Sequence, residues 1–196
     1  KSNKLSKQGQ IIAANLDLAL LVVTLSSPKT SLGFIDRFLL MVEPYEIPTI
    51  IVFNKADLYQ DEDLEVYAYL EDLYQGLGYT VILASAMTGD GVAELKAQLK
   101  DKVTMLSGQS GVGKSSLLNQ IQANLQLRVG DISDYSGKGQ HTTTFAEMFF
   151  LDEHTAIIDT PGIRDFGIID LEETEIGHYF PEIRELMKGC KFNDCK

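Results

Sequence analysis

The sequence is short of positive charge. Its 196 residues include 17 Lys and Arg against 28 Asp and Glu, so the formal net charge is −11. A chain with this balance does not bind nucleic acid through bulk electrostatic attraction. If RNA is a partner, we expect its contacts to come from local patches or from other parts of a longer protein. A chain that begins at Lys1 is typical of a fragment or a trimmed protein.

The sequence also lacks long hydrophobic segments and a spread of cysteines. The longest apolar run, LALLVVTL at 18–25, follows Asp17 and is far too short to span a bilayer. No secretory signal is visible. The two cysteines, Cys190 and Cys195, crowd the end of the chain, which is not the pattern of a disulfide framework. We therefore predict a cytoplasmic location and no membrane partner.

Apolar β-rich runs alternate with helix-like segments, and 44% of the residues are hydrophobic. A chain of this length holds one α/β domain with something small attached. Continuous apolar runs suit strands covered on both faces, so the pattern predicts a mainly parallel sheet with right-handed crossovers. The close pair 146–152 and 155–160 predicts an antiparallel hairpin at one edge. Expected strands are 18–26, 49–54, 80–85, 103–108, 146–152 and 155–160, and expected helices lie near 31–43, 61–76, 91–100 and 114–123.

The segment GQSGVGKSS forms a complete phosphate-binding loop signature between a predicted strand and a predicted helix. Its glycines let backbone N–H groups surround phosphates, and the helix N-terminus adds positive potential. We expect Lys114 to reach the β- and γ-phosphates and the Ser115 hydroxyl to ligate Mg²⁺. The predicted phosphate-binding residues are Gly108, Gln109, Ser110, Gly111, Val112, Gly113, Lys114, Ser115 and Ser116.

The tetrapeptide NKAD ends another apolar strand and matches a guanine-reading motif. Guanine presents its N1–H and 2-amino group as adjacent donors that one carboxylate accepts together, whereas adenine lacks this pair. Asp57 is therefore predicted to select GTP over ATP. We expect Asn54 to brace the loop and the Lys55 stem to lie along the base. Ser85 and Ala86 follow the next strand and fit a companion loop, in which a backbone N–H faces guanine O6.

Two further segments are expected around the γ-phosphate. Asp159 ends a strand, where a carboxylate can hold Mg²⁺ through water, and Gly162 of DTPG can offer its N–H to the γ-phosphate. Segment 124–145 is long for a loop in a compact domain and ends in GKGQHTTTF. A threonine hydroxyl that reaches Mg²⁺ would let this loop order around GTP. Of the three consecutive threonines (142–144) we favour Thr143, and a plain β-rich edge is the alternative.

These motifs form a GTPase set whose order is rotated. The usual order is P-loop, switch threonine, DxxG, NKxD and SA, whereas NKxD and SA come first here. A cyclic shift preserves every neighbour relation, and a fold whose ends lie close together tolerates permutation. We predict a circularly permuted, three-layer α/β P-loop GTPase fold. In this order the segment after DTPG leads towards the C-terminal cysteines, so we hypothesise that γ-phosphate sensing at Gly162 is passed to a C-terminal module.

The sequence resembles the circularly permuted, ribosome-small-subunit-dependent bacterial GTPases of the RsgA/YjeQ family over nearly its whole length. The pieces that carry the resemblance are IIAANLDLALLV, NKADL, GQSGVGKSSLLN, GKGQHTTT, DTPGIRDFG and FPEIRELMKGCKFNDC. The resemblance implies a GTPase that acts late in maturation of the small ribosomal subunit and whose hydrolysis of GTP to GDP is stimulated by that subunit. It also implies contact with ribosomal RNA, expected mainly on modules outside this chain. We expect a monomer.

The resemblance implies a three-part protein with an OB-fold, a permuted GTPase domain and a zinc-binding domain. We assign 1–14 to a linker from the OB-fold, 15–169 to the GTPase domain, and 170–196 to the start of the C-terminal helical and zinc-binding domain. The C-x₄-C spacing of Cys190 and Cys195 is within the range for half a zinc site. The family's remaining ligands, a His and a Cys, are implied beyond the end of the chain, so structural Zn²⁺ is expected in the complete protein.

A water-orienting glutamine is missing from the expected position. Many GTPases carry it just after the DxxG glycine, where this chain has Ile163, which can neither orient nor polarise water. We therefore expect slow intrinsic turnover. His141, in GKGQHTTT, is our candidate for positioning the water, and the resemblance supports it. A loop histidine held by the backbone is the alternative role. Arg164, beside Ile163, could instead contact RNA or a phosphate, or act as a catalytic finger. The predicted catalytic residues are His141, Lys114 and Gly162.

Three other functions stay open from the residues alone. A GTP-gated binding module with negligible hydrolysis would make Ile163 the mark of a lost activity. A permuted GTPase of the large ribosomal subunit is disfavoured by the HTTT loop and the terminal cysteine pair. An ATP-using P-loop enzyme is disfavoured by Asp57. Turnover with the partner present separates GTP hydrolysis from the binding module, and the base preference of an Asp57→Asn variant tests the ATP-using alternative.

Overall fold

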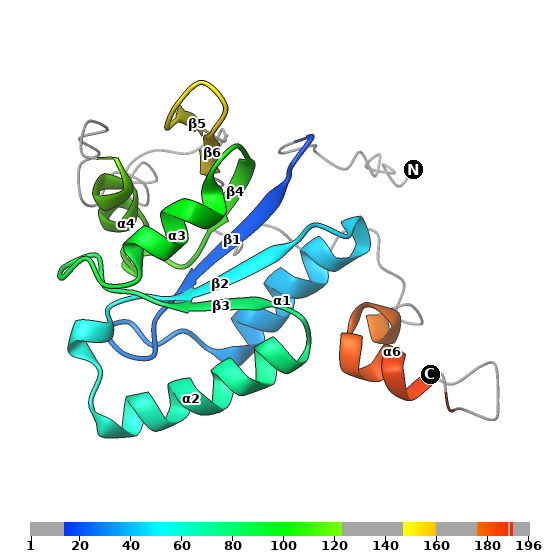
Figure 1. Ribbon diagram of the computed structural model, residues 1–196. Coiled ribbons are helices and arrows are strands. Elements are labelled where there is room, and N and C mark those ends of the chain that lie inside the picture. The colour runs from blue at the N-terminus through cyan, green and yellow to red at the C-terminus, as the bar shows by residue number, and fades with distance from the viewer. Residues whose placement is uncertain (1–13, 123–146, 160–175, 188, 190–196) are drawn as a thin grey trace, which may run out of the picture.

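The computed structural model describes residues 14–122, 147–159, 176–187 and 189. In this part of the chain strands and helices alternate as predicted (Figure 1). The strands are β1 (Leu18–Val23), β2 (Thr49–Phe53), β3 (Thr80–Leu83), β4 (Val103–Ser107), β5 (Glu147–Phe150) and β6 (Ala156–Asp159). The helices are α1 (Leu32–Val42), α2 (Asp61–Gly76), α3 (Val92–Leu99), α4 (Lys114–Ile121) and α6 (Pro181–Met187), with 3₁₀ turns η1 (Glu43–Tyr45), η2 (Ala56–Leu58) and η4 (Ile176–Tyr179).

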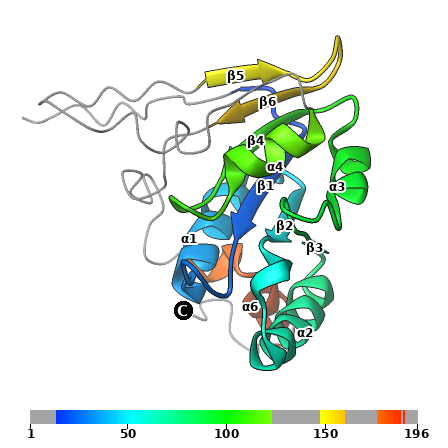
Figure 2. The same ribbon diagram turned by 90° about the vertical axis from the view of Figure 1, so that its left-hand side faces the viewer.

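The six strands form one sheet in the order β3-β2-β1-β4-β6-β5. All neighbouring strands pair in parallel except β5 and β6, which pair antiparallel at the edge. Figure 2 shows this hairpin at one end of the molecule and α2 at the other. The mainly parallel sheet and the edge hairpin are therefore confirmed.

Helices cover both faces of the sheet, which explains the unbroken apolar run of β1. Successive strand side chains point to opposite faces. The odd-numbered residues of 19–23 pack beneath α1 and α2, and the even-numbered residues of 18–22 pack beneath α3 and α4. All six β1 residues are buried. The result is three layers, with α1 and α2 on one side in Figure 1 and α3 and α4 on the other.

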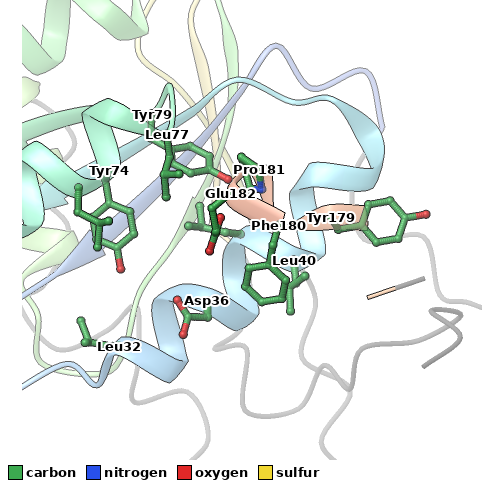
Figure 3. Close-up of a pocket in the computed structure, with 12 residues that line it drawn as sticks. Leu32, Asp36, Leu40, Tyr74, Leu77, Tyr79, Tyr179, Phe180, Pro181 and Glu182 are labelled. Carbon is green, nitrogen blue, oxygen red and sulfur yellow. The ribbon is translucent and has the colours of Figure 1, made fainter. Parts of the chain in front are cut away.

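The C-terminal segment 176–187 lies against α1. Its Arg184 guanidinium pairs with the Glu43 carboxylate at 3.0 Å. A cavity of about 170 Å³ lies between this segment, α1 and α2, and Figure 3 shows Phe180 beside Leu40 in its wall. Burial raises the pKa of Asp36 in this cavity, and the neighbouring Glu182 carboxylate adds to the effect.

None of the described helices is long and apolar enough to cross a membrane. The predicted linker before residue 14, the predicted loop 124–145 and both cysteines lie outside the described residues. The domain boundary expected near residue 170 also lies outside them and stays a prediction.

Candidate nucleotide site

Four candidate segments leave the sheet at the same edge. The phosphate loop follows β4, NKAD follows β2, the Ser-Ala pair follows β3, and Asp159 ends β6. In a parallel sheet the carboxyl ends of the strands form the crevice where ligands bind. β1 lies between β2 and β4, and its own exit loop, 24–30, runs between the base-reading and phosphate-binding segments.

Two glycines of the phosphate loop are required by close approach. Gly108 has φ 151°, and a Cβ there would collide with the Val22 carbonyl oxygen of β1. Gly113 has φ 93°, and a Cβ there would collide with the Asn54 side-chain amide. A glycine tolerates such left-handed conformations and leaves room for the neighbour. The loop is therefore held against both β1 and the NKAD segment.

Lys114 begins α4 and is a buried cation, with 8% of its surface exposed. Its Nζ donates to the carbonyl oxygens of Gly108 (2.8 Å) and Gln109 (3.0 Å). An ammonium group has three donors, so one remains for an anionic ligand. Burial lowers the pKa of Lys114, and the Asp159 carboxylate opposes the shift. Asp159 stands in register with Leu106 on the adjacent strand, which places this carboxylate beside the phosphate loop.

Asn54 joins three segments of the site and is 1% exposed. Its side-chain N–H donates to the Val112 carbonyl oxygen at 2.8 Å. Its side-chain oxygen accepts the Ala86 backbone N–H at 3.2 Å. The brace predicted for Asn54 therefore takes a definite form, in which the NKAD segment is tied to the phosphate loop and to the Ser-Ala loop.

The remaining NKAD side chains face the same edge. Asp57 is exposed, and one of its carboxylate oxygens accepts a hydrogen bond from the Ser85 hydroxyl. Ser85 itself is fully buried, and its oxygen also accepts the backbone N–H groups of Met87 and Thr88 at 3.2 Å each. Lys55 adopts a left-handed conformation, with φ 65°. Ser85 therefore orients the carboxylate through its side chain, whereas the sequence suggested only a backbone contact from this loop.

Two further features were not predicted from the sequence. The Lys55 ammonium donates to the Ser27 carbonyl oxygen in loop 24–30. In the same loop the Pro28 ring lies so close to Gly111 that a Cβ added there would be 3.6 Å from it, at van der Waals contact. The second feature is Tyr59, whose hydroxyl contacts the Asn54 carbonyl oxygen. Short motifs do not signal these contacts, because each joins strands distant in sequence or uses a residue with many possible roles.

The structure brings together the whole phosphate loop, Asn54, Lys55, Asp57, the Ser-Ala pair and Asp159. The other predicted site residues lie outside the described residues. They are His141, Thr143, Gly162, Cys190 and Cys195. Across the described ranges, no group of three or more His, Cys, Asp or Glu side chains is placed to hold a metal ion.

Comparisons with known proteins agree with this geometry. The family model described as RsgA GTPase matches residues 1–169. A protein of Bacteroides thetaiotaomicron named small ribosomal subunit biogenesis GTPase RsgA 2 is 50% identical over 195 residues, which cover 100% of this chain and 63% of that protein. The RsgA protein of Flavobacterium psychrophilum is also 50% identical, over 60% of its length. This chain thus spans somewhat less than two thirds of these relatives.

Solved structures give the same result. YjeQ from Thermotoga maritima is similar with a TM-score of 0.74 and 41% identity, over 92% of this chain and 59% of that one. YloQ, described as a circularly permuted GTPase, is similar with a TM-score of 0.70 and 38% identity, over 92% of this chain and 56% of that one. The predicted α/β fold with permuted order is therefore confirmed. With a family model that matches most of its length, this chain belongs to the RsgA GTPase family.

Proposed function

We propose that this chain is the GTP-binding and GTP-hydrolysing part of a late biogenesis factor of the small ribosomal subunit. The observation that carries the proposal is the position of Asn54. Its amide is bonded both to the phosphate loop, through Val112, and to the Ser-Ala loop, through Ala86. A guanine reader and a phosphate reader locked together at one sheet edge form a site for one guanine nucleotide.

Asp57 is the residue we assign to guanine recognition. It is exposed at the edge of the sheet, and the Ser85 hydroxyl holds one of its oxygens. A carboxylate accepts both the N1–H and the 2-amino group of guanine, a pair that adenine lacks. The Lys55 ammonium is bonded to the Ser27 carbonyl oxygen of loop 24–30, and the Lys55 stem would cover the base. Ser85 and Ala86 complete the base pocket.

Lys114 and the surrounding loop are the residues we assign to the phosphates. The buried ammonium keeps a donor for the β- and γ-phosphates, while the amides of 108–116 surround them. The Ser115 hydroxyl follows Lys114, and the Asp159 carboxylate acts on the same lysine electrostatically. These hard oxygen donors fit Mg²⁺, which Ser115, Asp159 and Thr143 would hold. Bound with the nucleotide, this ion supplies charge neutralisation at the phosphates.

The residues that we assign to hydrolysis are identified from sequence motifs alone. Gly162 would donate its N–H to the γ-phosphate, and His141 would position the attacking water in place of the glutamine that Ile163 replaces. Intrinsic turnover is then slow, because an isoleucine cannot orient water. Stimulation by the small ribosomal subunit would act on this step.

The proposed partner is the small ribosomal subunit with its RNA. The names of the relatives support this choice. A cytoplasmic location is part of the same proposal. We further propose a monomer divided as 1–14, 15–169 and 170–196. The last part would begin a domain in which Cys190 and Cys195 share a structural Zn²⁺ with ligands from the rest of the protein.

GTP turnover by the full-length protein, with and without purified small subunits, tests the proposal. We expect slow turnover alone and strong stimulation by small subunits. Large subunits are the matched control and should give no stimulation. Stimulation by large subunits only would assign the protein to the other subunit. Tight GTP binding with no stimulation by either would indicate a GTP-gated binding module.

A further inference from the structure

Tyr59 lies directly after the NKADL segment and is buried, with 7% of its surface exposed. Its hydroxyl donates to the backbone carbonyl oxygen of Asn54 at 2.8 Å. The Tyr59 hydroxyl oxygen in turn accepts the backbone N–H of Leu25 at 3.1 Å. One phenol therefore joins the exits of β1 and β2 at the edge where the nucleotide site lies.

With the bond from Tyr59, every polar group of Asn54 has a hydrogen-bond partner. The Asn54 backbone N–H donates to the Val23 carbonyl oxygen of β1 at 2.9 Å. Its side chain bonds to Val112 and to Ala86. The Tyr59 hydroxyl holds the remaining polar group, the backbone carbonyl. Each polar atom of Asn54 thus has a partner from a different segment.

Tyr59 also closes the turn that carries Asp57. The turn begins at Asn54, and its far end is held because the Tyr59 N–H donates to the Ala56 carbonyl oxygen at 3.1 Å. The Ala56 N–H in turn donates to the Ala84 carbonyl oxygen at 3.0 Å. The side chain of Tyr59 reaches back across five residues to the start of the turn. The two ends of the turn are therefore locked to each other, with Asp57 between them.

We propose that Tyr59 is a positioning residue for guanine recognition, which sets the place of the Asp57 carboxylate through the turn. This inference rests on the proposed function, since it assigns a residue to the same base site. A carboxylate that accepts two adjacent donors needs closer alignment than one that accepts a single donor. Loss of the Tyr59 hydroxyl should therefore weaken the binding of a guanine nucleotide more than that of a hypoxanthine nucleotide. Hypoxanthine keeps N1–H but lacks the 2-amino group.

Equilibrium binding of GDP and IDP to the full-length protein tests this assignment. The variant is Tyr59→Phe, which keeps the ring and removes only the hydroxyl. We expect it to narrow the preference for GDP over IDP by about threefold to tenfold, as for the loss of one hydrogen bond. The matched control is Tyr67→Phe. Tyr67 belongs to the same core cluster, but its hydroxyl donates at 2.6 Å to Glu71 of α2, which is not part of the turn.

The outcomes separate positioning from mere support of the fold. Equal weakening of GDP and IDP in Tyr59→Phe, or no change in either, would overturn the assignment. If Tyr59→Phe fails to fold, amide exchange in the wild type replaces it: GDP should slow exchange at Leu25 more than IDP does, and equal slowing counts against the assignment. A wild type that binds no guanine nucleotide would overturn the proposed function itself. A wild type that prefers GDP, with an unchanged ratio in the variant, would overturn only the role of Tyr59.

Discussion

At the guanine end of the site polar groups pair with one another, whereas at the phosphate end they surround a buried charge. Asn54 and Ser85 are both buried, and hydrogen bonds from neighbouring segments fix them. Asp57 is held by one such bond and otherwise faces outward. Lys114, in contrast, is a buried cation that faces loop carbonyl oxygens and the Asp159 carboxylate.

The difference shows how one edge of a sheet serves two kinds of recognition. In the proposed site the guanine end would select by the arrangement of donors and acceptors, so small displacements should alter specificity more than affinity. The phosphate end would select by charge, since a desolvated ammonium interacts more strongly with an anion than an exposed one does. Ser107, the last residue before the phosphate loop, has a buried hydroxyl without a hydrogen-bond partner among the described residues, which suits an end built less by pairing.

We expect the largest effect from a substitution that removes the positive charge of the phosphate end. Lys114→Ala should lower GTP affinity on the order of a thousandfold, because the charge-assisted contact of the one free donor and the Coulombic attraction of the buried ammonium for the β- and γ-phosphates are lost together. The preference for GTP over ITP should stay unchanged, since the guanine end is intact. Equilibrium binding of GTP and ITP measures both quantities.

The control for this change is Lys100→Ala, which removes the same charge from an exposed position. Lys100 lies between α3 and β4, before the end of β4 that is opposite to the phosphate loop. It should leave the affinity within about twofold, as expected for a screened surface charge. A Lys114→Ala variant that changed the base preference as well would show that the two ends are not independent. The contrast between a guanine end that sets base preference and a phosphate end that sets affinity would then be wrong.

The next effect changes the guanine end alone. Asp57→Asn should lower GTP affinity by about 10- to 100-fold, because an amide cannot accept both guanine donors. Binding of xanthosine triphosphate should improve, since its 2-oxo group can accept from the asparagine amide. Competition between the two nucleotides measures the reversal. Asp61→Asn, at an exposed carboxylate in the first turn of α2, is the control, and a loss of GTP affinity in both variants would argue against base reading by Asp57.

Much of this arrangement could be predicted from the sequence for physical reasons. All five residues of TIIVF, which forms β2, are buried. An unbroken apolar run of this kind therefore predicts a strand whose sheet is covered by helices on both faces. The glycines at 108 and 113 mark close backbone approaches that side chains would block. The order of the motifs along the chain was enough to predict the permutation, since each motif ends a strand and the sheet brings the strand ends together.

The contacts that hold the guanine end were harder to predict. The bond from Ser85 to Asp57 spans 28 residues, and that from Asn54 to Val112 spans 58. Such pairs depend on strand register, which periodicity alone does not give. Tyr59 was missed because a tyrosine after an apolar strand usually reports core packing, and only the position of its hydroxyl shows the link to Asn54.

The smallest expected effect is on the pH dependence of the free energy of unfolding, to which the two ends should contribute with opposite signs. Burial raises the pKa of Tyr59 and of Tyr74 to about 12, and it also raises the pKa values of Tyr67 and Tyr79. These tyrosines pack on the α1 and α2 side of the sheet. Above about pH 10 the unfolded chain releases phenol protons that the folded chain keeps, so the free energy of unfolding should fall as pH rises towards 12. Below about pH 10 these groups should have no effect on the slope.

Lys114 should contribute with the opposite sign. Burial lowers its pKa, so the folded chain loses this proton before the unfolded chain does, and the free energy of unfolding rises over that interval. Each coupled proton changes the slope by at most about 1.4 kcal/mol per pH unit. Denaturant unfolding at intervals between about pH 9 and pH 12 should therefore give a shallower fall for Tyr59→Phe and a steeper fall for Lys114→Ala than for the wild type. Equal slopes in all three proteins would mean that neither end holds its proton differently from the unfolded chain, and the contrast between a paired end and a charged end would lose its electrostatic basis.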